Sequence, residues 1–421
     1  MTARRHPFLV AVAAMGLLVA LVVGWFEWRV DSTGSMPVAR AAPEAALVAR
    51  GAYLARAGNC VGCHTARGGT PYAGGRGIDT PFGTVIASNL TPDADSGLGR
   101  WSADDFWNAM HHGRSRDGRL LYPAFPYPNF TLVTREDSDA LHAFLRSLAP
   151  ERRTVPPHRL RFPYNLQAAL AAWRALYFRP ATFEPDVQRS AAWNRGSYLV
   201  RSLGHCAACH GERNALGAIS DDIELGGGLI PMQNWYAPSL RSAQEAGVAD
   251  WPQHEVVALL KTGIAPRASV MGPMAEVVFR STQHLSDADL DAMATFLRAL
   301  PPTAATTAPR DVERANVPAA ATLYETHCAS CHGKQGEGAA GRYPALAGNR
   351  ALSLPSPHNV VKAILHGGFA PSTAGNPRPY GMPPFGQVLS DEEVALLATH
   401  LRQSWGHRAP AVSALDVLRA R

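Results

Sequence analysis

Six cysteines occur in this chain of 421 residues, and all of them fall into three Cys-x-x-Cys pairs, each followed directly by a histidine. The three motifs consist of Cys60, Cys63 and His64, of Cys206, Cys209 and His210, and of Cys328, Cys331 and His332. Two thiols at this spacing can reach the two vinyl groups of one porphyrin, and the adjacent imidazole can bind its iron. The pattern therefore predicts three covalently attached haem c groups.

Zinc binding and thioredoxin-like redox chemistry are the other common uses of a Cys-x-x-Cys pair. Zinc would need a second cysteine or histidine pair near each motif, and the sequence offers none. A thioredoxin-like motif would lie in a βαβ pattern, whereas the flanks of these motifs have helical periodicity. All six cysteines are used by the motifs, so the sequence predicts no structural disulfide.

The second axial position of each iron is the next requirement. A methionine thioether commonly fills it in electron-transfer proteins, where it raises the reduction potential. Met382 has the expected place in the third repeat, on a loop after the middle helix. In the second repeat we prefer Met274 to Met271, because Met271 is closer to the preceding glycine-rich turn.

The first repeat has Phe125 where this thioether is expected, and phenylalanine cannot bind iron. The haem would then be five-coordinate behind an apolar lid, or another side chain would replace the methionine. The middle helix ends with Met110, His111 and His112. His112 matches His366 of the third repeat, which already has a methionine, so His111 is the first choice, followed by His112 and Met110. A His111 ligand would give haem 1 the lowest of the three potentials.

Helices must position these groups, and each repeat shows the same order of them. A short helix with a small residue and an aromatic precedes each motif, at Gly51-Ala52-Tyr53-Leu54, Gly196-Ser197-Tyr198-Leu199 and, more loosely, Thr322-Leu323-Tyr324. The middle helices are expected to end at Gly113, Gly263 and Gly367. Apolar-periodic closing helices with capping signals are predicted at 137–148, 286–300 and 390–405.

The N-terminal residues 8–26 are uncharged and almost wholly apolar. Such a run is long enough to cross a bilayer core of about 30 Å. Arg4 and Arg5 precede it, which would leave the N-terminus in the cytoplasm. A cleaved signal peptide is the alternative. Either way the haem-bearing part would be exported, so we expect it at the inner membrane, with the haem domains on the periplasmic side.

Charge and motifs exclude several function classes. The net charge of +6 is spread along the chain without a block of lysine or arginine, and there is no nucleic-acid module, so we expect no nucleic-acid partner. The sequence also lacks a dinucleotide fingerprint, a P-loop and an evident Ser-His-Asp set. We therefore expect electron transfer without catalytic chemistry of its own.

Several segments outside the motifs resemble one known family. They are Thr80-Pro-Phe-Gly83, Ser88-Asn-Leu-Thr-Pro92, Gly97-Leu-Gly-Arg-Trp101, Asp117-Gly-Arg-Leu-Leu-Tyr-Pro123, Gly272-Pro-Met-Ala-Glu-Val-Val278, Ser281-Thr-Gln-His284 and Ser404-Trp-Gly406. From about residue 44 to its end the chain is similar to the triheme cytochrome c subunit of membrane-bound periplasmic dehydrogenases of alcohols, gluconate, sugars or aldehydes. The resemblance implies a catalytic partner of the molybdenum-hydroxylase, flavin or quinoprotein type. It also implies ubiquinone or a terminal oxidase as acceptor.

This family usually has methionine at the position of Phe125. A phenylalanine at this position resembles the branch of the family whose partners are molybdenum hydroxylases that act on aldehydes or N-heterocycles. A multihaem peroxidase is an alternative function, because an open iron in the first repeat could bind peroxide. A cytochrome subunit of a respiratory oxidase is a second alternative.

The resulting fold class is all-α, with three class I cytochrome c domains in tandem after an N-terminal transmembrane helix. The predicted boundaries are 1–30 for a cytoplasmic stub and membrane anchor or signal, 44–150 for domain 1, 151–187 for a linker, 188–300 for domain 2, 301–311 for a second linker, 312–407 for domain 3 and 408–421 for a C-terminal tail.

Overall fold

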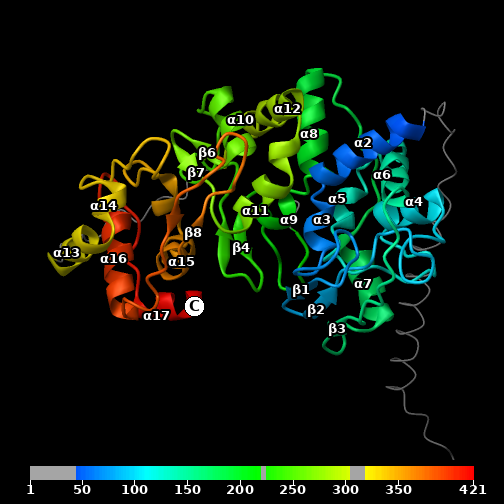
Figure 1. The fold of residues 1–421 in the computed structure, drawn as a ribbon, viewed down its shortest axis with the longest axis horizontal. Coiled ribbons are helices and arrows are strands. Elements are labelled where there is room, and N and C mark those ends of the chain that lie inside the picture. Colours follow the sequence, from blue (N-terminus) through cyan, green and yellow to red (C-terminus); the bar gives the residue numbers. More distant parts are fainter. Residues whose placement is uncertain (1–43, 220–223, 304–317) are drawn as a thin grey trace, which may run out of the picture.

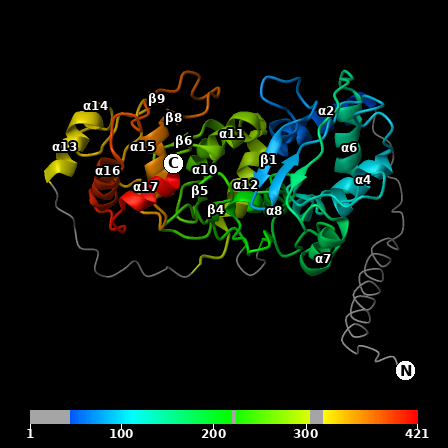
Figure 2. The ribbon, with the colours of Figure 1, turned by 90° about the horizontal axis from the view of Figure 1, so that it is seen from below.

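The computed structural model describes residues 44–219, 224–303 and 318–421. These residues form three units that follow one another along the longest axis of the molecule (Figure 1). Figure 2 shows the same order from below, with α2, α4 and α6 at one end and α13, α14 and α16 at the other.

Each unit repeats one order of helices: a helix before the motif, a short motif helix, a middle helix and a closing helix. In the first unit these are α2 (Glu44–Ala57), α3 (Cys60–Cys63), α4 (Ala103–His112), α5 (Tyr127–Phe130) and α6 (Arg135–Arg146). The second unit contains α8 (Ala191–Arg201), α9 (Ala207–His210), α10 (Gln253–Thr262), α11 (Pro273–Arg280), η1 (Thr282–His284) and α12 (Asp287–Arg298). The third contains α13 (Pro318–His327), α14 (Ala329–His332), η2 (Arg350–Leu352), α15 (His358–His366), α16 (Asp391–Gln403) and α17 (Ala414–Ala420).

The helix before the motif crosses the closing helix closely in the first two units. A Cβ atom added at Gly51 on α2 would overlap the backbone carbonyl of Ala140 on α6. The same relation joins Gly196 on α8 to Ala292 on α12. Only glycine allows this approach, because any side chain would push the helix axes apart. The small residues at the two Gly-x-Tyr-Leu segments thus fix the crossings that hold the motif helices in place.

Short strands contradict the predicted all-α fold. The structure contains β1 (Gly77–Thr80), β2 (Gly83–Ile86), β3 (Arg159–Leu160), β4 (Gly228–Ile230), β5 (Trp235–Ala237), β6 (Ile264–Ala265), β7 (Ala268–Ser269), β8 (Gly368–Phe369) and β9 (Gly381–Met382). They form one three-stranded antiparallel sheet, β1-β2-β3, and three two-stranded ones. Strands of two to four residues are too short to show an alternating pattern, which is why the sequence did not reveal them.

The predicted fold class also begins with a transmembrane helix. No helix among the described residues is both long and apolar enough to span a membrane. The predicted anchor, residues 1–30, lies outside the described part of the chain.

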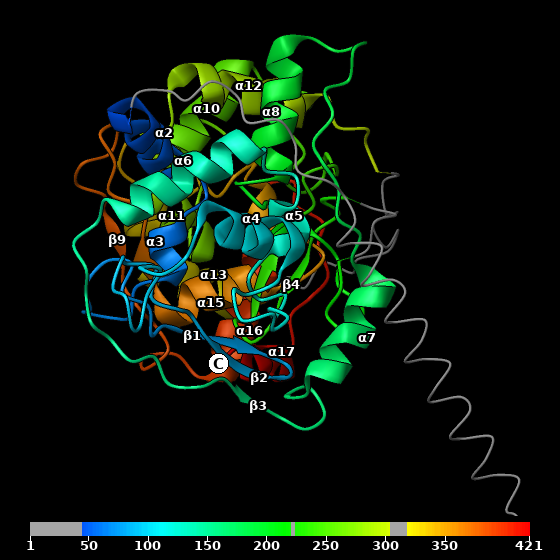
Figure 3. The same cartoon turned by 90° about the vertical axis from the view of Figure 1, so that its right-hand side faces the viewer.

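The segment between the first two units contains the helix α7 (Gln167–Tyr177), inside the range 151–187 that was predicted as a linker. Figure 3 shows α7 at the edge of the molecule, away from the crossing of α2 and α6. Residues 408–421 include α17, whose Val417 and Ala420 are fully buried beside α15 and α16.

Two hydrophobic cores hold the described residues together. One core is continuous through the first and second units and includes Leu54, Leu141, Tyr198, Leu290 and Phe296. The third unit has a core of its own, built around α15, α16 and α17. The first two units therefore form one structural body, because the residues of both share one buried interior.

A buried carboxylate ties the first unit to the second. Asp137 on α6 is 1% exposed and accepts hydrogen bonds from Arg50 Nε at 2.7 Å and from the Tyr198 hydroxyl at 2.6 Å. Arg50 belongs to the first unit and Tyr198 to the second. The carboxylate thus joins the closing helix of one unit to the first helix of the next.

The reverse contact has the same chemistry. Asp289 on α12 accepts from Arg195 Nε at 2.8 Å and from the Tyr53 hydroxyl at 2.6 Å. Burial would raise the pKa of Asp289, but the hydrogen bonds from Arg195 and Tyr53 outweigh it and lower that pKa. Asp289 lies three residues after the N-cap Ser286, where a capping box was predicted, and its carboxylate serves the inter-unit contact instead.

Candidate haem-binding sites

Each motif histidine is held by a hydrogen bond between Nδ1 and a backbone carbonyl. The three bonds are His64 to Ser88 at 2.8 Å, His210 to Pro238 at 2.7 Å and His332 to Pro344 at 2.9 Å. A carbonyl oxygen can only accept, so the proton is on Nδ1 and Nε2 carries a free lone pair. That tautomer is the one an iron ligand requires, and the structure produces it in all three motifs.

Three glycines fix the loops that supply these carbonyls. Gly74, Gly227 and Gly338 each donate their backbone N–H to the carbonyl of the preceding motif histidine, at 2.8 Å in every case. All three have positive φ, of 73°, 84° and 65°. A Cβ at Gly74 would lie 2.5 Å from the Ser88 carbonyl oxygen, which is far inside van der Waals contact. Glycine is therefore required both by the backbone conformation and by the close approach of the loop.

The thiols lie in an apolar environment. Burial raises the pKa of Cys60 and of Cys206 to about 12, and that of Cys328 to about 11. Zinc sites and reactive thiolates need the opposite shift. Among the described residues no group of three or more His, Cys, Asp or Glu could hold a metal ion. The surroundings fit thiols that become thioethers and do not fit zinc or thiolate chemistry.

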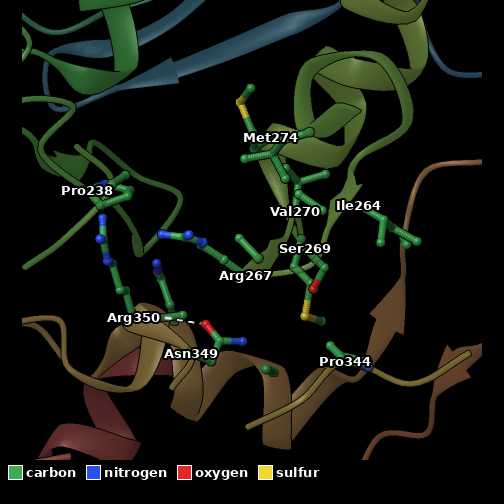
Figure 4. Close-up of a pocket in the computed structure, with 18 of the residues that line it drawn as sticks. Pro238, Ile264, Arg267, Ser269, Val270, Met274, Pro344, Asn349 and Arg350 are labelled. Atoms are coloured by element: carbon green, nitrogen blue, oxygen red, sulfur yellow. Dashed lines mark hydrogen bonds between the residues drawn. The ribbon is translucent and has the colours of Figure 1, made fainter. Parts of the chain in front are cut away.

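A cavity of about 1380 Å³ lies between the second and third units. Both of their motifs line it, with Cys206, Cys209 and His210 on one side and Cys328, Cys331 and His332 on the other. Figure 4 shows Met274, Val270 and Ser269 of the second unit facing Asn349 and Arg350 of the third across this space. Its walls are mainly apolar side chains, as a porphyrin requires. One continuous cavity therefore contains both predicted attachment sites.

The predicted methionine ligands also line this cavity. Met274 lies in the first turn of α11, and Met382 ends strand β9, which pairs with β8. Met271 lines the cavity as well, but a Cβ added at Gly368 would lie 3.5 Å from Met271 Cε. Met271 is therefore directed toward the third unit, so the geometry supports the choice of Met274 for the second haem.

Backbone hydrogen bonds place Phe125 in the same position as Met274. The N–H of Leu121 donates to the Gly113 carbonyl at 2.8 Å, and the N–H of Val270 donates to the Gly263 carbonyl at 2.9 Å. Gly113 and Gly263 both end a middle helix with positive φ. Phe125 and Met274 each come four residues after the donor. The loop methionine of the second unit is thus replaced by phenylalanine in the first, although Met274 lies in the first turn of α11 and Phe125 comes two residues before α5.

The structure places His111 and His112 at the last turn of α4. His111 is 8% exposed, stacks on Trp107 with ring centroids 4.4 Å apart, and is hydrogen-bonded to the backbone of Thr131. His112 stands edge-on to His111 at 4.6 Å. These contacts tie α4 to the segment after α5, and they show no partner of His111 from the motif helix α3.

The first and second attachment loops touch each other. His205, which precedes Cys206, has its Nε2 3.3 Å from the Gly58 carbonyl, two residues before Cys60. Burial raises the pKa of Cys209, and the nearby Cys63 raises it further, so the two motifs interact electrostatically. Arg76 hydrogen-bonds the Gly62 carbonyl within the first motif and pairs with Glu276 of α11 at 3.0 Å. All three motifs are therefore in one connected series.

Sequence reasoning missed the groups that orient the motif histidines. The acceptors are backbone carbonyls, which leave no mark of their own in residue type. A usable signal existed in the repeated Pro-x-Leu at Pro238 and Pro344. The two Tyr-Asp contacts between units were also missed, because their partners are more than 60 residues apart in sequence.

Comparisons with known proteins agree with this arrangement. The sequence model of the family described as "Cytochrome c" matches residues 48–149 and 317–405. The model described as "Cytochrome C oxidase, cbb3-type, subunit III" matches residues 191–297. Each matched segment contains one of the three motifs.

Individual relatives are similar over most of the chain. The cytochrome c subunit of alcohol dehydrogenase (quinone) from Gluconacetobacter polyoxogenes is 38% identical, over 90% of this chain and 85% of that protein. The gluconate 2-dehydrogenase cytochrome c subunit of Pantoea cypripedii is 37% identical, over 88% and 89%. A nicotinate dehydrogenase subunit of Pseudomonas putida is 38% identical, over 95% of this chain and 33% of that longer protein.

Proposed function

We propose, because this chain belongs to the family of cytochrome c subunits of dehydrogenase complexes, that it carries electrons from a periplasmic dehydrogenase through three covalent haem c groups. The acceptor we propose is ubiquinone or a terminal oxidase. As in its relatives, the chain is an electron-transfer subunit and not the catalytic one.

The single observation that carries this proposal is the state of the motif histidines. His64, His210 and His332 each keep Nε2 free by donating Nδ1–H to a carbonyl. Haem c, when bound, supplies an iron that alternates between the ferric and ferrous states. The chain provides the proximal ligand and two thiols for attachment at every motif, and a mainly apolar cavity at the second and third motifs.

The order of the units supports a relay. The second and third motifs line one cavity, and the first and second attachment loops are in contact at Gly58 and His205. Electron transfer needs no side chain to move between such sites, so the rigid packing of the two cores is an advantage. We propose that electrons pass along the row of units, with the second haem in the middle.

The partner is proposed from the relatives. Their names include a quinone-dependent alcohol dehydrogenase, gluconate 2-dehydrogenase and nicotinate dehydrogenase. A quinoprotein, a flavin or a molybdenum-hydroxylase catalytic subunit would each deliver electrons to this type of cytochrome. We propose that the haem domains are on the periplasmic side of the inner membrane, because the apolar residues 8–26 would direct export whether or not they are later removed.

Isolation of the chain from its source membranes in mild detergent tests the proposal. We expect a catalytic subunit to co-purify, and the cofactor of that subunit to identify its type. Addition of the partner's substrate should reduce all of the haem in the complex without a mediator. Hydrogen-peroxide turnover by the isolated chain, with no co-purifying dehydrogenase, would instead support a peroxidase and would overturn the proposal.

A further inference from the structure

The distal side of the first haem has no ligand on the loop that supplies one in the other units. The inference below rests on the proposed function, since it concerns how the first of three haems is ligated. Phe125 corresponds to Met274, since each comes four residues after the matching loop hydrogen bond, and a phenyl ring has no lone pair for iron. Another side chain of the first unit must therefore supply the ligand, or the iron is five-coordinate.

The cavity lining indicates which residues of the middle helices face the predicted haem sites. In the second and third units the cavity is lined by Leu260 and Ile364, each three residues before the glycine that ends its helix. The two residues that follow, at positions 261 and 262 and at 365 and 366, are not among the described residues that line the cavity. In the first unit the same place, three residues before Gly113, belongs to Met110. Met110 is 5% exposed.

His111 corresponds to Lys261, and both perform the same structural task. Lys261 Nζ donates to the Leu285 carbonyl at 2.7 Å, which joins α10 to the residue just before the cap of α12. His111 is hydrogen-bonded to the backbone of Thr131, three residues before the cap of α6. In the second unit Lys261 is thus directed toward α12 and not into the cavity. The contacts of His111 with Trp107 and Thr131 follow the same direction.

Three other imidazoles around the first unit are also directed elsewhere. His142 on α6 corresponds to Ala294 on α12, because each comes two residues after the alanine that a glycine of the crossing helix contacts, Ala140 and Ala292. Ala294 is not among the described residues that line the cavity. His158 is exposed and accepts the Ile86 N–H at 3.0 Å. His205 bonds the Gly58 carbonyl.

We propose that Met110 supplies the second axial ligand of the first haem from the middle helix, in place of the missing loop methionine. It is the only methionine among residues 44–219. A thioether is a suitable ligand for haem iron, and the unbranched side chain is flexible enough to reach across the space left by its neighbours. The middle helix thus does in the first unit what a loop does in the second and third.

Methionine ligation gives ferric haem a characteristic weak charge-transfer band in the far red, which can be counted per haem. Wild-type protein should show three equivalents of it. Met110→Leu, which keeps the volume and apolar character of the side chain, should show two. Met274→Leu and Met382→Leu are positive controls that each lose one. His111→Gln, which retains a donor toward Thr131, should keep three.

A rescue variant separates ligation from packing. Met110→Leu combined with Phe125→Met places a thioether on the loop, and we expect the third equivalent to return. Covalent haem is counted in every variant by intact mass, so failure of the proposed three-haem function would be seen as fewer than three haems in the wild type. Three haems with only two methionine-ligated equivalents in the wild type would overturn the Met110 proposal. Unchanged spectra in Met110→Leu would overturn it as well.

Discussion

The hydroxyl of Tyr198 and the carboxylate of Asp137 give the most informative test of how the first two units are joined. Their hydrogen bond is 2.6 Å long and enclosed, because Tyr198 is 5% and Asp137 1% exposed. We therefore examine Tyr198→Phe, Asp137→Asn and the double variant as a thermodynamic cycle. The quantity of interest is their coupling in the free energy of unfolding.

The size of this coupling follows from burial. A hydrogen bond to a charged group contributes about 1.5–3 kcal/mol, and water cannot replace the partner at this enclosed site. We expect a coupling of about 2 kcal/mol. Arg50 also pairs with Asp137, but its side chain is 56% exposed, so solvent compensates for much of that ion pair. The mirror pair, Tyr53 and Asp289, should give about 1 kcal/mol, since Tyr53 is only half-buried and also lies 3.4 Å from Ser286 Oγ.

Guanidinium unfolding of the holoprotein measures the coupling, with tryptophan fluorescence and haem absorbance as two probes. The first two units share one core, so both should unfold in one transition. Tyr177→Phe is a matched control, because Tyr177 is 39% exposed. Its effect should be within about 0.5 kcal/mol. A Tyr198–Asp137 coupling below that value, or separate transitions for the two units, would refute this account of the interface.

Three further predictions concern the sites and the pH dependence. Gly74→Ala should lower the fraction of chains that carry haem on the first motif, as measured by peptide mass, and should destabilise the protein by about 1–3 kcal/mol more than Gly68→Ala does. Gly68 is the control, because it has a similar φ but nothing within 4 Å of an added Cβ. Equal effects of the two substitutions would contradict the role of the loop contact at Gly74. Met274→Leu should convert one haem to a spectrum without methionine ligation while Met271→Leu should not, and the reverse result would exchange their roles. The pKa of Asp289 is lowered in the folded protein, so its contribution to stability is present above its unfolded pKa of about 4 and is lost as the pH falls through the lower folded pKa. Asp289→Asn should therefore reduce the loss of unfolding free energy that acid causes. A pH profile of stability that is unchanged in this variant would contradict the prediction.

The sequence was sufficient where a feature depends on neighbouring residues. The helices before the motifs, the glycines that end α4, α10 and α15, and the cap of α16 all follow from local patterns, and the structure has them. Helix α6 begins two residues before the predicted start, because Thr134 is its N-cap. Asp137 is used for the contact between units.

Features that depend on tertiary packing could not be read in the same way. The short strands β6 to β9 arise where the chain returns past the end of a middle helix, and two residues carry no periodicity. The direction of His111 is set by Trp107 and Thr131, which the sequence could not rank against an iron ligand. Comparison of Met110 with Leu260 and Ile364 became possible only when the cavity was defined.

The central claim, that one chain carries a three-haem relay, is tested most directly by counting haem and electrons in the same preparation. Intact mass should show three covalent haems per chain, and a reductive titration should require three electrons per chain to complete. Loss of the Cys60 and Cys63 pair by substitution with alanine should reduce both numbers by one. Two haems in the wild type, or a haem that takes no electron, would contradict the account.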